Sequence, residues 1–386
     1  MTSEPHRPWS EWFASETATI KGAGRWRTPL AFDAFGAAGL REGRTVVSFA
    51  SNDYLGLTAH PEVRAAAGEA VERWGTGSGA SRLVVGSRPV HHELELELAR
   101  WRSTDSAILF PTGFAANLGL LATLGGPGVV VHSDELNHAS IIDGCRMARA
   151  NGARVETYRH IDVEALAMNM ERAAADPLTS RQLVVTDTVF SMDGDVVPLD
   201  RLSSLCAEHD ALLVLDEAHA VLESPPSTPL NGATIIQVGT LSKALGALGG
   251  FVAGSQVLID LLVNRARSYI FTTAPSPADA AAALAALRIL RSAEGAELLN
   301  RLRSSIDRVR PGHPSPIIPI VLGDEAAALA AAQHLLDRGL LVPAIRPPTV
   351  PVGSSRLRIA LSSAHTDEQI DSLLDALHAL ELDGDQ

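Results

Sequence analysis

The chain has 386 residues, of which 46% are hydrophobic and 20% are charged, so it can bury a sizeable core and disorder is not indicated. Its 45 acidic and 32 basic side chains give a net charge of −13, which argues against a general nucleic-acid binder because such proteins need a basic face. At roughly 100–200 residues per domain, this length predicts two domains, or one large domain with an appendage.

The N-terminal part of the sequence is irregular, and we expect residues 1–45 to form an arm or a short helix. This part has no basic-then-apolar signal architecture, and no run in the chain approaches ~18 apolar residues, so no membrane span is predicted. Cys145 and Cys206 lie far apart, in no metal-binding or redox spacing. Buried free thiols and a cytoplasmic location are therefore expected.

Residues 46–275 are predicted to form a large α/β domain. Two helical patterns, at 61–74 and 90–101, flank the glycine-rich loop GTGSGAS. From about residue 105 to 255, short apolar runs typical of strands alternate with helical runs. This alternation predicts a mainly parallel sheet covered on both faces, with ligands bound at the carboxyl ends of its strands. Residues 276–386 predict a smaller C-terminal α+β domain.

A distinctive polar group follows each of the main predicted strands. SAILF is followed by a helix that begins near Gly113 and Phe114, and the free N–H groups of such a helix start suit a phosphate. The other strand ends lead to His138, to Ser191, to Asp216 and His219, and to Thr240 and Lys243. A sheet that directs an anion site, two histidines, an aspartate and a lysine to one crevice is typical of a cofactor enzyme.

The combination fits pyridoxal 5′-phosphate. The aldehyde of this cofactor needs a lysine, its ring nitrogen needs a carboxylate, and its phosphate needs N–H groups and hydroxyls. Lys243, Asp216 and the helix start at Gly113 meet these needs in turn. Lysine is rarely buried without a function, and partial burial favours the neutral amine that acts as a nucleophile.

Two other kinds of site were weighed against this interpretation. Asp216 with His219 looks like half of a metal site, and so does the run from His132 to His138, but no third cluster completes either set. No metal is therefore expected. Gly75-Thr-Gly77-Ser-Gly-Ala80 imitates a dinucleotide-binding motif, but it follows a helix rather than a strand, so an active-site turn is the better interpretation.

Eight segments now carry a family resemblance, in one order along the chain: SNDYLGL, GSGASRLVVGS, PTGFAAN, NHASIIDG, VFSMDGDVVPL, LDEAH, TLSKALG and IRPPTVPVGSSRLRIALSSAH. Together they resemble the α-oxoamine synthases, which are fold type I pyridoxal-phosphate transferases. The resemblance implies a large mainly parallel-sheet domain, a smaller C-terminal α+β domain, and a homodimer with active sites at the subunit interface.

Within that family, the segment IRPPTVPVGSSRLR looks most like the members that join L-alanine to a pimeloyl thioester, with loss of carbon dioxide, in biotin biosynthesis. The acyl carrier, coenzyme A or acyl carrier protein, stays open. Members that use glycine or serine with another acyl chain are the nearest alternative. A non-catalytic protein on the same scaffold is a further alternative, against which the joint presence of Lys243, Asp216, His219 and His138 argues.

The resemblance also implies a role for each candidate residue. Lys243 would hold the cofactor as a Schiff base and later move the substrate α-proton, and Asp216 would pair with the ring nitrogen. His219 and Ser191 would contact the phenolic oxygen of the cofactor ring, His138 would stack on the ring face, and Gly113, Phe114 and Thr240 would bind the phosphate. Thr272 and Thr273 would bind the phosphate in the neighbouring subunit. Asn52 and Arg358 would bind the amino-acid carboxylate, and Thr349 would lie at the substrate entrance. Arginine suits a carboxylate because its planar fork binds both oxygens.

Two segments depart from the family pattern. After His219 the chain reads AVLESPPSTPLNG, a proline-rich and shortened loop where relatives have a glycine-rich one. The N-terminal arm is short, and the helix that bears a basic contact to the acyl chain in relatives has no clear counterpart. The acyl donor is therefore the least constrained part of the expected function.

Overall fold

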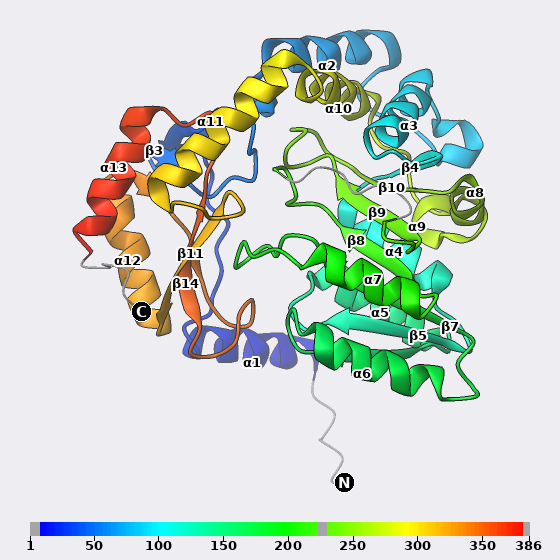
Figure 1. The fold of residues 1–386 in the computed structure, drawn as a ribbon. Helices are drawn as coiled ribbons and strands as arrows, with labels where there is room; N and C mark the ends of the chain where they lie inside the picture. The colour runs from blue at the N-terminus through cyan, green and yellow to red at the C-terminus, as the bar shows by residue number, and fades with distance from the viewer. Residues whose placement is uncertain (1–7, 223–229, 381–386) are drawn as a thin grey trace.

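The computed structural model describes residues 8–222 and 230–380, and its main feature is a seven-stranded sheet (Figure 1). The strands lie in the order β4-β10-β9-β8-β7-β5-β6, and within this sheet only β10 runs antiparallel to its neighbours. Their bounds are β4 Ser106–Phe110, β5 Val129–Asp134, β6 Arg154–Tyr158, β7 Arg181–Asp187, β8 Leu212–Asp216, β9 Ile235–Thr240 and β10 Gly250–Gly254. The parallel strands therefore end at one edge, where the polar residues that follow them meet.

Helices cover both faces of this sheet, which explains why its strands are apolar on both sides. In β7, Leu183 and Val185 pack in one cluster with α4, α5 and α8, while Val184 packs in another with α6 and α7. The bounds of these helices are α4 Gly113–Leu124, α5 Ala139–Ala150, α6 Val163–Ala174, α7 Leu199–Glu208 and α8 Gln256–Arg265. The short helix α9, Arg267–Ile270, follows α8 and packs beside α4.

A third group of helices packs at the β4 and β10 side of the sheet. Leu109 of β4 and Phe251 of β10 belong to one buried cluster with residues of α2 (Pro61–Trp74), α3 (Pro89–Trp101) and α10 (Pro277–Leu290). The same cluster continues into the C-terminal part of the chain through Leu302 and Ile359. The two parts of the molecule therefore share one continuous apolar core.

The C-terminal part contains a three-stranded sheet in the order β11-β14-β13, with α11, α12 and α13 packed around it. Its elements are α11 Ala293–Val309, β11 Ile317–Gly323, α12 Glu325–Asp337, β13 Ala344–Ile345, β14 Ser355–Ala360 and α13 Asp367–His378. The N-terminal strands β1 Asp33–Phe35, β2 Ala38–Arg41 and β3 Arg44–Ser48 form a second small sheet with β12, Leu340–Leu341. The domain boundaries expected at residues 45/46 and 275/276 stay a prediction.

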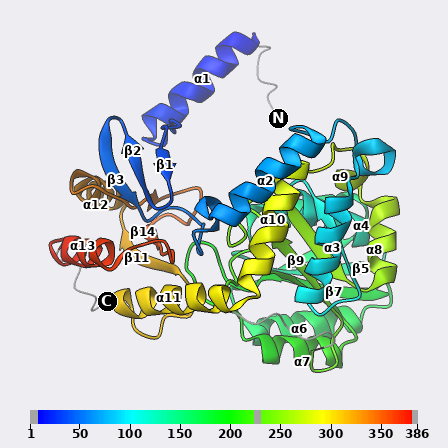
Figure 2. The same cartoon turned by 90° about the horizontal axis from the view of Figure 1, so that it is seen from above.

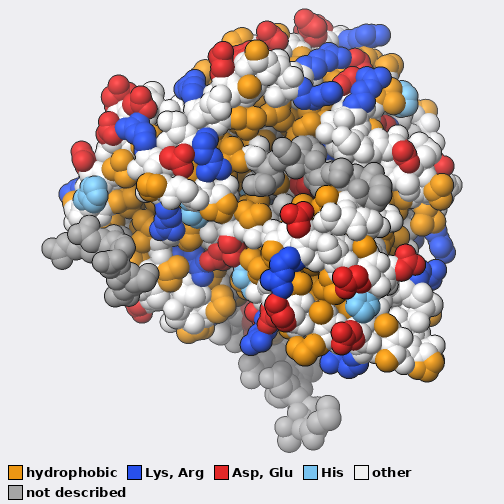
Figure 3. Space-filling model, in the orientation of Figure 1, with side chains coloured by type: hydrophobic (Ala, Val, Ile, Leu, Met, Phe, Trp, Pro, Cys, Tyr) orange, Lys and Arg blue, Asp and Glu red, His pale blue; other side chains and the backbone are white. Residues whose placement is uncertain are grey.

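The first helix, α1 (Trp9–Gly22), stands away from the rest of the molecule in Figure 2. None of its residues is buried, and Trp9, Trp12 and Phe13 are exposed while they contact one another. Acidic and basic side chains are interspersed over the face drawn in Figure 3. Among the helices of the described residues, none is long and apolar enough to cross a membrane.

Candidate active site

Lys243 lies in the turn-rich segment between β9 and β10, at the carboxyl edge of the central sheet. Gly246 has a φ of 62°, and the Leu241 N–H donates to the Gly249 carbonyl at 3.0 Å, so a tight loop forms rather than a helix. The Nζ atom of Lys243 lies 2.9 Å from His219 Nε2. Burial lowers the pKa of Lys243, although the charges of Asp216 and Asp187 oppose this change. The amine is thereby brought closer to its neutral, nucleophilic form.

His219 connects Lys243 to a buried tyrosine. Its Nδ1 atom lies 2.6 Å from the hydroxyl of Tyr54, and that hydroxyl donates to Asn52 Oδ1 at 3.1 Å. Burial lowers the pKa of His219 well below its ordinary value, and the charges of Lys243 and Arg358 lower it further. The ring is therefore neutral at pH 7, with one nitrogen directed to Lys243 and the other to Tyr54.

Asp216, the last residue of β8, is held by the side-chain amide of Asn117 in α4. Its Oδ2 accepts from Asn117 Nδ2 at 2.6 Å, and its Oδ1 accepts from the Ala218 N–H at 3.0 Å. Asn117 belongs to α4 and also donates to Ser140 Oγ at 2.9 Å. Because a buried carboxyl group needs hydrogen-bond partners, these contacts fix the position of the Asp216 side chain at the end of β8.

A second carboxyl group, Asp187, lies beside Asp216 at the end of the neighbouring strand. The two residues are paired in the register of β7 and β8. Oδ2 of Asp187 accepts a hydrogen bond from the backbone N–H of His138 at 2.8 Å. His138 in turn caps α5, because its Nδ1 atom accepts from the Ser140 N–H. Burial and the charge of Asp216 raise the pKa of Asp187 well above its ordinary value. The raised pKa favours the protonated form of Asp187, whose Oδ2 atom positions the backbone of His138.

The predicted anion site lies at the start of α4. Thr112 caps the helix by accepting from the Ala115 N–H at 3.0 Å, and the N–H groups of the first turn have no carbonyl partner within the helix. A Cβ atom on Gly250 would lie 2.4 Å from the Gly113 nitrogen, so only glycine fits opposite the helix start. Thr240 lies next to Gly113 and its Oγ1 is 2.7 Å from Ser242 Oγ. N–H groups and hydroxyls at a helix start match a phosphate.

Arg358 brings the C-terminal sheet to this edge. It is buried in β14, and its Nη2 donates to Asn52 Oδ1 at 3.0 Å while its Nε donates to the Ser191 carbonyl at 2.5 Å. The neighbouring Arg356 pairs with Asp193 in the same loop as Ser191. The guanidinium of Arg358 is thus oriented from two sides, as recognition of a carboxylate requires.

Most of the predicted site residues therefore come together. Hydrogen bonds join Lys243, His219, Asn52, Arg358 and Ser191 through Tyr54. Asp216 and His138 are joined through Asn117 and Ser140, and the charge of Asp216 acts on Lys243, so the two networks form one connected set. Gly113, Phe114 and Thr240 surround the helix start next to it. Ser191 enters this set through its carbonyl rather than its hydroxyl.

Three predicted residues lie outside this connected set. Thr349 is exposed, and its Oγ1 accepts from Arg27 Nη2 at 3.5 Å. Thr272 and Thr273 lie between α9 and α10, and no hydrogen bond joins them to the set within residues 8–222 and 230–380. The proline-rich loop after His219 lies largely at 223–229, outside the described residues. Across the described ranges, no group of three or more His, Cys, Asp or Glu is arranged to hold a metal ion.

Three residues of this site were not predicted from the sequence. Tyr54 and Asn117 lie within SNDYLGL and PTGFAAN, two of the segments that carry the family resemblance. Asn117 also falls one helical turn after Gly113, which puts it near the same strand ends. Asp187 is the last residue of β7, but the apolar run RQLVVTDTVF continues to Phe190, so the strand-end rule that located Asp216 pointed to Ser191 instead.

Comparison with known proteins decides the family. The model of the family described as aminotransferase class I and II matches residues 44–377. The chain belongs to this family. The 8-amino-7-oxononanoate synthase of Anaeromyxobacter dehalogenans is 47% identical over 391 aligned residues, covering 96% of this chain and 95% of the relative. That of Methylococcus capsulatus is 48% identical over 354 residues, covering 87% and 89%.

Solved structures confirm the fold type I expectation. A serine palmitoyltransferase from Sphingomonas wittichii superposes with a TM-score of 0.85 at 31% identity, covering 96% of this chain and 98% of the other. An 8-amino-7-oxononanoate synthase from Francisella tularensis superposes with a TM-score of 0.69 at 27% identity, covering 87% and 96%.

Proposed function

We propose that the chain is a pyridoxal-phosphate-dependent acyltransferase that condenses L-alanine with a pimeloyl thioester, giving 8-amino-7-oxononanoate, carbon dioxide and free thiol in biotin biosynthesis. The observation that carries this proposal is that relatives with this activity in their names are 47% and 48% identical over most of the chain. The segments that carry the family resemblance also contribute Lys243, Asp216, His219 and Arg358 to one site.

The residues of the site fit the cofactor. Lys243 would bind its aldehyde carbon, Asp216 would face its ring nitrogen, and the first turn of α4 with Thr240 would hold its phosphate. Bound there, pyridoxal phosphate supplies an electron sink for the negative charge that forms at the α-carbon of the amino acid. The buried and doubly held Asp216 favours a protonated ring nitrogen, which strengthens that sink.

The side chains then divide the work on the substrates. Arg358, oriented by Asn52 and the Ser191 carbonyl, binds the carboxylate of L-alanine. Nζ of Lys243 accepts the α-proton, and its low pKa keeps it available as a base. The α-carbon then bonds to the thioester carbonyl carbon as the carbon–sulfur bond breaks and the thiol leaves with a proton. The bond to the carboxylate breaks next, carbon dioxide leaves, and the α-carbon takes up a proton.

Neutral histidines complete this arrangement. His138 is held by Asp187 through its backbone N–H and by Ser140 through its Nδ1 atom. Burial lowers the pKa of His138, so the ring donates a hydrogen bond without carrying a charge that would compete with Lys243. We assign it to the developing ketone oxygen of the acyl group.

Carbon dioxide and thiol release test the reaction together. With L-alanine labelled at its carboxyl carbon and pimeloyl-coenzyme A, the protein should release labelled carbon dioxide and free thiol in a one-to-one ratio, and the product should have the mass of 8-amino-7-oxononanoate. Thiol release without labelled carbon dioxide would mean simple thioester hydrolysis and would contradict the proposal.

One observation favours a second candidate, a serine-dependent synthase with a longer acyl chain. The Sphingomonas wittichii serine palmitoyltransferase superposes better than the Francisella tularensis structure, with a TM-score of 0.85 against 0.69. Sequence identity favours the alanine-dependent reaction, because it is 31% to this serine palmitoyltransferase and 47% to the 8-amino-7-oxononanoate synthase of Anaeromyxobacter dehalogenans. We therefore rank the alanine-dependent reaction first.

We further propose a homodimer in the cytoplasm. Phe114, Phe271 and the segment Leu83–Val85 are exposed apolar groups, and α9 packs against both α4 and residues 82–86. This apolar surface borders the start of α4 and carries Thr272 and Thr273 next to Phe271, as sites shared between subunits require. Buried free thiols at Cys145 and Cys206 support a reducing compartment. Light scattering of Phe271→Asp, expected to be monomeric, tests the dimer.

A further inference from the structure

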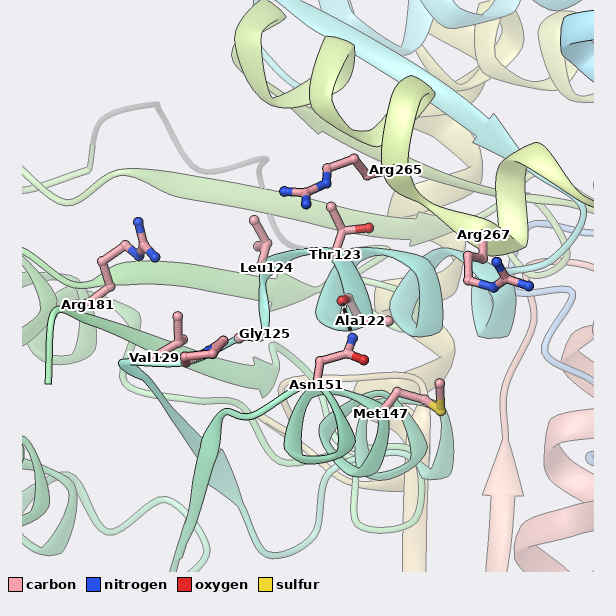
Figure 4. A pocket seen from close by; sticks show the side chains of 12 residues that line it. Ala122, Thr123, Leu124, Gly125, Val129, Met147, Asn151, Arg181, Arg265 and Arg267 are labelled. Carbon is pink, nitrogen blue, oxygen red and sulfur yellow. Dashed lines mark hydrogen bonds between the residues drawn. The ribbon is translucent and has the colours of Figure 1, made fainter. Parts of the chain in front are cut away.

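A hollow of about 490 Å³ lies at the edge of the central sheet opposite the candidate active site (Figure 4). Its floor includes the turn from Leu124 to Val129, which joins α4 to β5, and its sides include Asn151 after α5. Arg181 stands beside it at the start of β7, and Arg265 and Arg267 stand beside it at the junction of α8 and α9, as Figure 4 shows. Nothing in the proposed catalytic function uses this hollow.

The charge of this hollow is unusual for the chain. The residues that line it include three arginines and no aspartate or glutamate, although the whole chain has a net charge of −13. None of the three arginines forms an ion pair with any residue that the structure describes. Some exposed arginines elsewhere form such pairs, for example Arg288 with Glu93 and Arg291 with Glu97, while Arg301 and Arg338 form none with the described residues. The positive charge of the hollow is therefore not neutralised from within the described chain.

The carboxyl ends of nearby helices offset only part of this positive charge. The helices α4, α5 and α8 all end at the hollow, and the carboxyl end of a helix carries roughly half a negative charge. Three such ends offset about 1.5 of the three positive charges, which leaves a surplus of about 1.5. A surplus of this size suits a divalent anion such as a phosphate group, which arginine binds through paired hydrogen bonds.

A second hollow of about 430 Å³ adjoins the first and differs in its chemistry. Both are lined by Arg181, Arg265 and Leu124, so the two hollows lie side by side and share these arginines. Leu212 and Leu261 give the second hollow apolar walls, while Asp210 adds a carboxylate that the first hollow lacks; Leu183 lines it as well. Apolar walls with one acceptor suit a flat ring and sugar hydroxyls.

We propose that the two hollows form one binding site for a nucleoside phosphate, with the phosphates among the arginines and the nucleoside in the second hollow. Each volume lies within the range of about 300–1,000 Å³ that is usual for small-molecule sites. Arg181 is the first residue of β7 and Asp187 is its last, so the site lies roughly 20 Å from the catalytic residues. The ligand is thus an effector and not a substrate of the condensation.

Calorimetric titration of the cofactor-loaded protein with ATP tests this site. Wild type should bind ATP saturably, and binding should weaken with added salt because the contacts are ionic. The double variant Arg181→Gln/Arg265→Gln should bind about 100-fold more weakly, at about tenfold for each arginine removed. The matched control Arg301→Gln/Arg338→Gln removes two exposed arginines of the C-terminal part that form no ion pair with residues 8–222 or 230–380, and it should bind like wild type.

Three further outcomes decide between explanations. Absence of saturable ATP binding, or equal binding by both double variants, would overturn the proposal. Pyrophosphate binding as tight as that of ATP would show a simple anion site and remove the nucleoside from it. Light scattering measures whether either double variant changes the oligomeric state. Dissociation of a dimer by Arg181→Gln/Arg265→Gln, and not by the control, would mean that these arginines pair with acidic residues of a second copy and would overturn the proposal.

Discussion

The two edges of the central sheet differ in how their charged residues are held. At the carboxyl edge, Asp216 is fixed by Asn117 and His219 by Tyr54, so each ionisable group has a dedicated neighbour. At the opposite edge, Arg181 and Arg265 stand around a hollow without an ion-pair partner in the described part of the chain. The carboxyl edge is therefore preorganised, so small changes there should alter catalysis, whereas changes at the opposite edge should alter only ligand binding.

The largest expected effect comes from Lys243→Ala. Loss of the base and of the covalent link to the cofactor should lower the rate of thiol release by about 10⁴-fold or more. The chain has only one other lysine, Lys21, which is exposed in α1 and lies over the ring of Trp26.

Lys21 therefore provides a matched control for this prediction. Lys21→Ala should keep full activity, and borohydride reduction of the wild type should attach the cofactor to Lys243 alone, as peptide mass spectrometry would show. Cofactor attached to Lys21, or to a Lys243→Ala variant, would contradict the assignment.

The paired carboxyl groups at the carboxyl edge should respond very differently to the same change. Asp216→Asn removes the charge opposite the ring nitrogen and should lower turnover by roughly 10²–10³-fold. Asp187→Asn should cost less than about tenfold, because the raised pKa of Asp187 favours its protonated form, which asparagine resembles in shape and charge. Steady-state kinetics of both variants at pH 7 measures this, and equal losses would show that Asp187 carries charge.

Tyr54→Phe tests whether the hydrogen bond between Tyr54 and His219 contributes to catalysis at Lys243. Removing the hydroxyl that holds His219 Nδ1 should lower turnover about tenfold while the bound cofactor is retained. The pH at which activity is half-maximal should also change, because the electrostatic environment of Lys243 would change. Tyr158→Phe removes another buried hydroxyl away from this set and should change stability but not the pH profile.

The smallest effect concerns stability at the same edge. His160 lies between Asp134 and Asp195, with its ring nitrogens 3.0 and 2.7 Å from their carboxylates. Burial alone would lower the pKa of His160, but these two carboxylates outweigh it and raise the pKa to about 10. A raised pKa means that this contribution to stability is complete below pH 6.5 and is lost as the pH rises through about 10.

Removing this histidine should therefore matter only on the acidic side of that window. His160→Gln should lower the free energy of unfolding by ~2 kcal/mol at pH 6, after allowance for solvent screening, and by progressively less towards pH 10 and above. Denaturant titrations across pH 6–11 measure it, and a difference between wild type and variant that does not change with pH would contradict it.

The sequence predicts the central sheet and its ligand-binding edge well, since strand ends in a parallel sheet meet at one place whatever the details of packing. It locates Lys243, Asp216 and His219 for that reason, each at or soon after a strand end. It does not predict Tyr54, because contact between Tyr54 and His219 joins residues 165 positions apart.

Other features escape sequence reasoning because they depend on pairings that leave no local pattern. The parallel pairing of β3 with β12 joins residues 44–48 to 340–341, although the first segment reads as the border of an arm. The arginine-lined hollow is of the same kind, since Arg181 and Arg265 come from segments whose local sequence shows only a strand start and a helix end.

Thiol release from pimeloyl-coenzyme A by the cofactor-loaded protein, with L-alanine, glycine or L-serine as acceptor, tests the central claim most directly. The preorganised edge described above predicts rapid release with L-alanine and release near background with the other two. Release with L-serine or glycine but not with L-alanine would contradict the proposed substrate, while the family and the fold would stand.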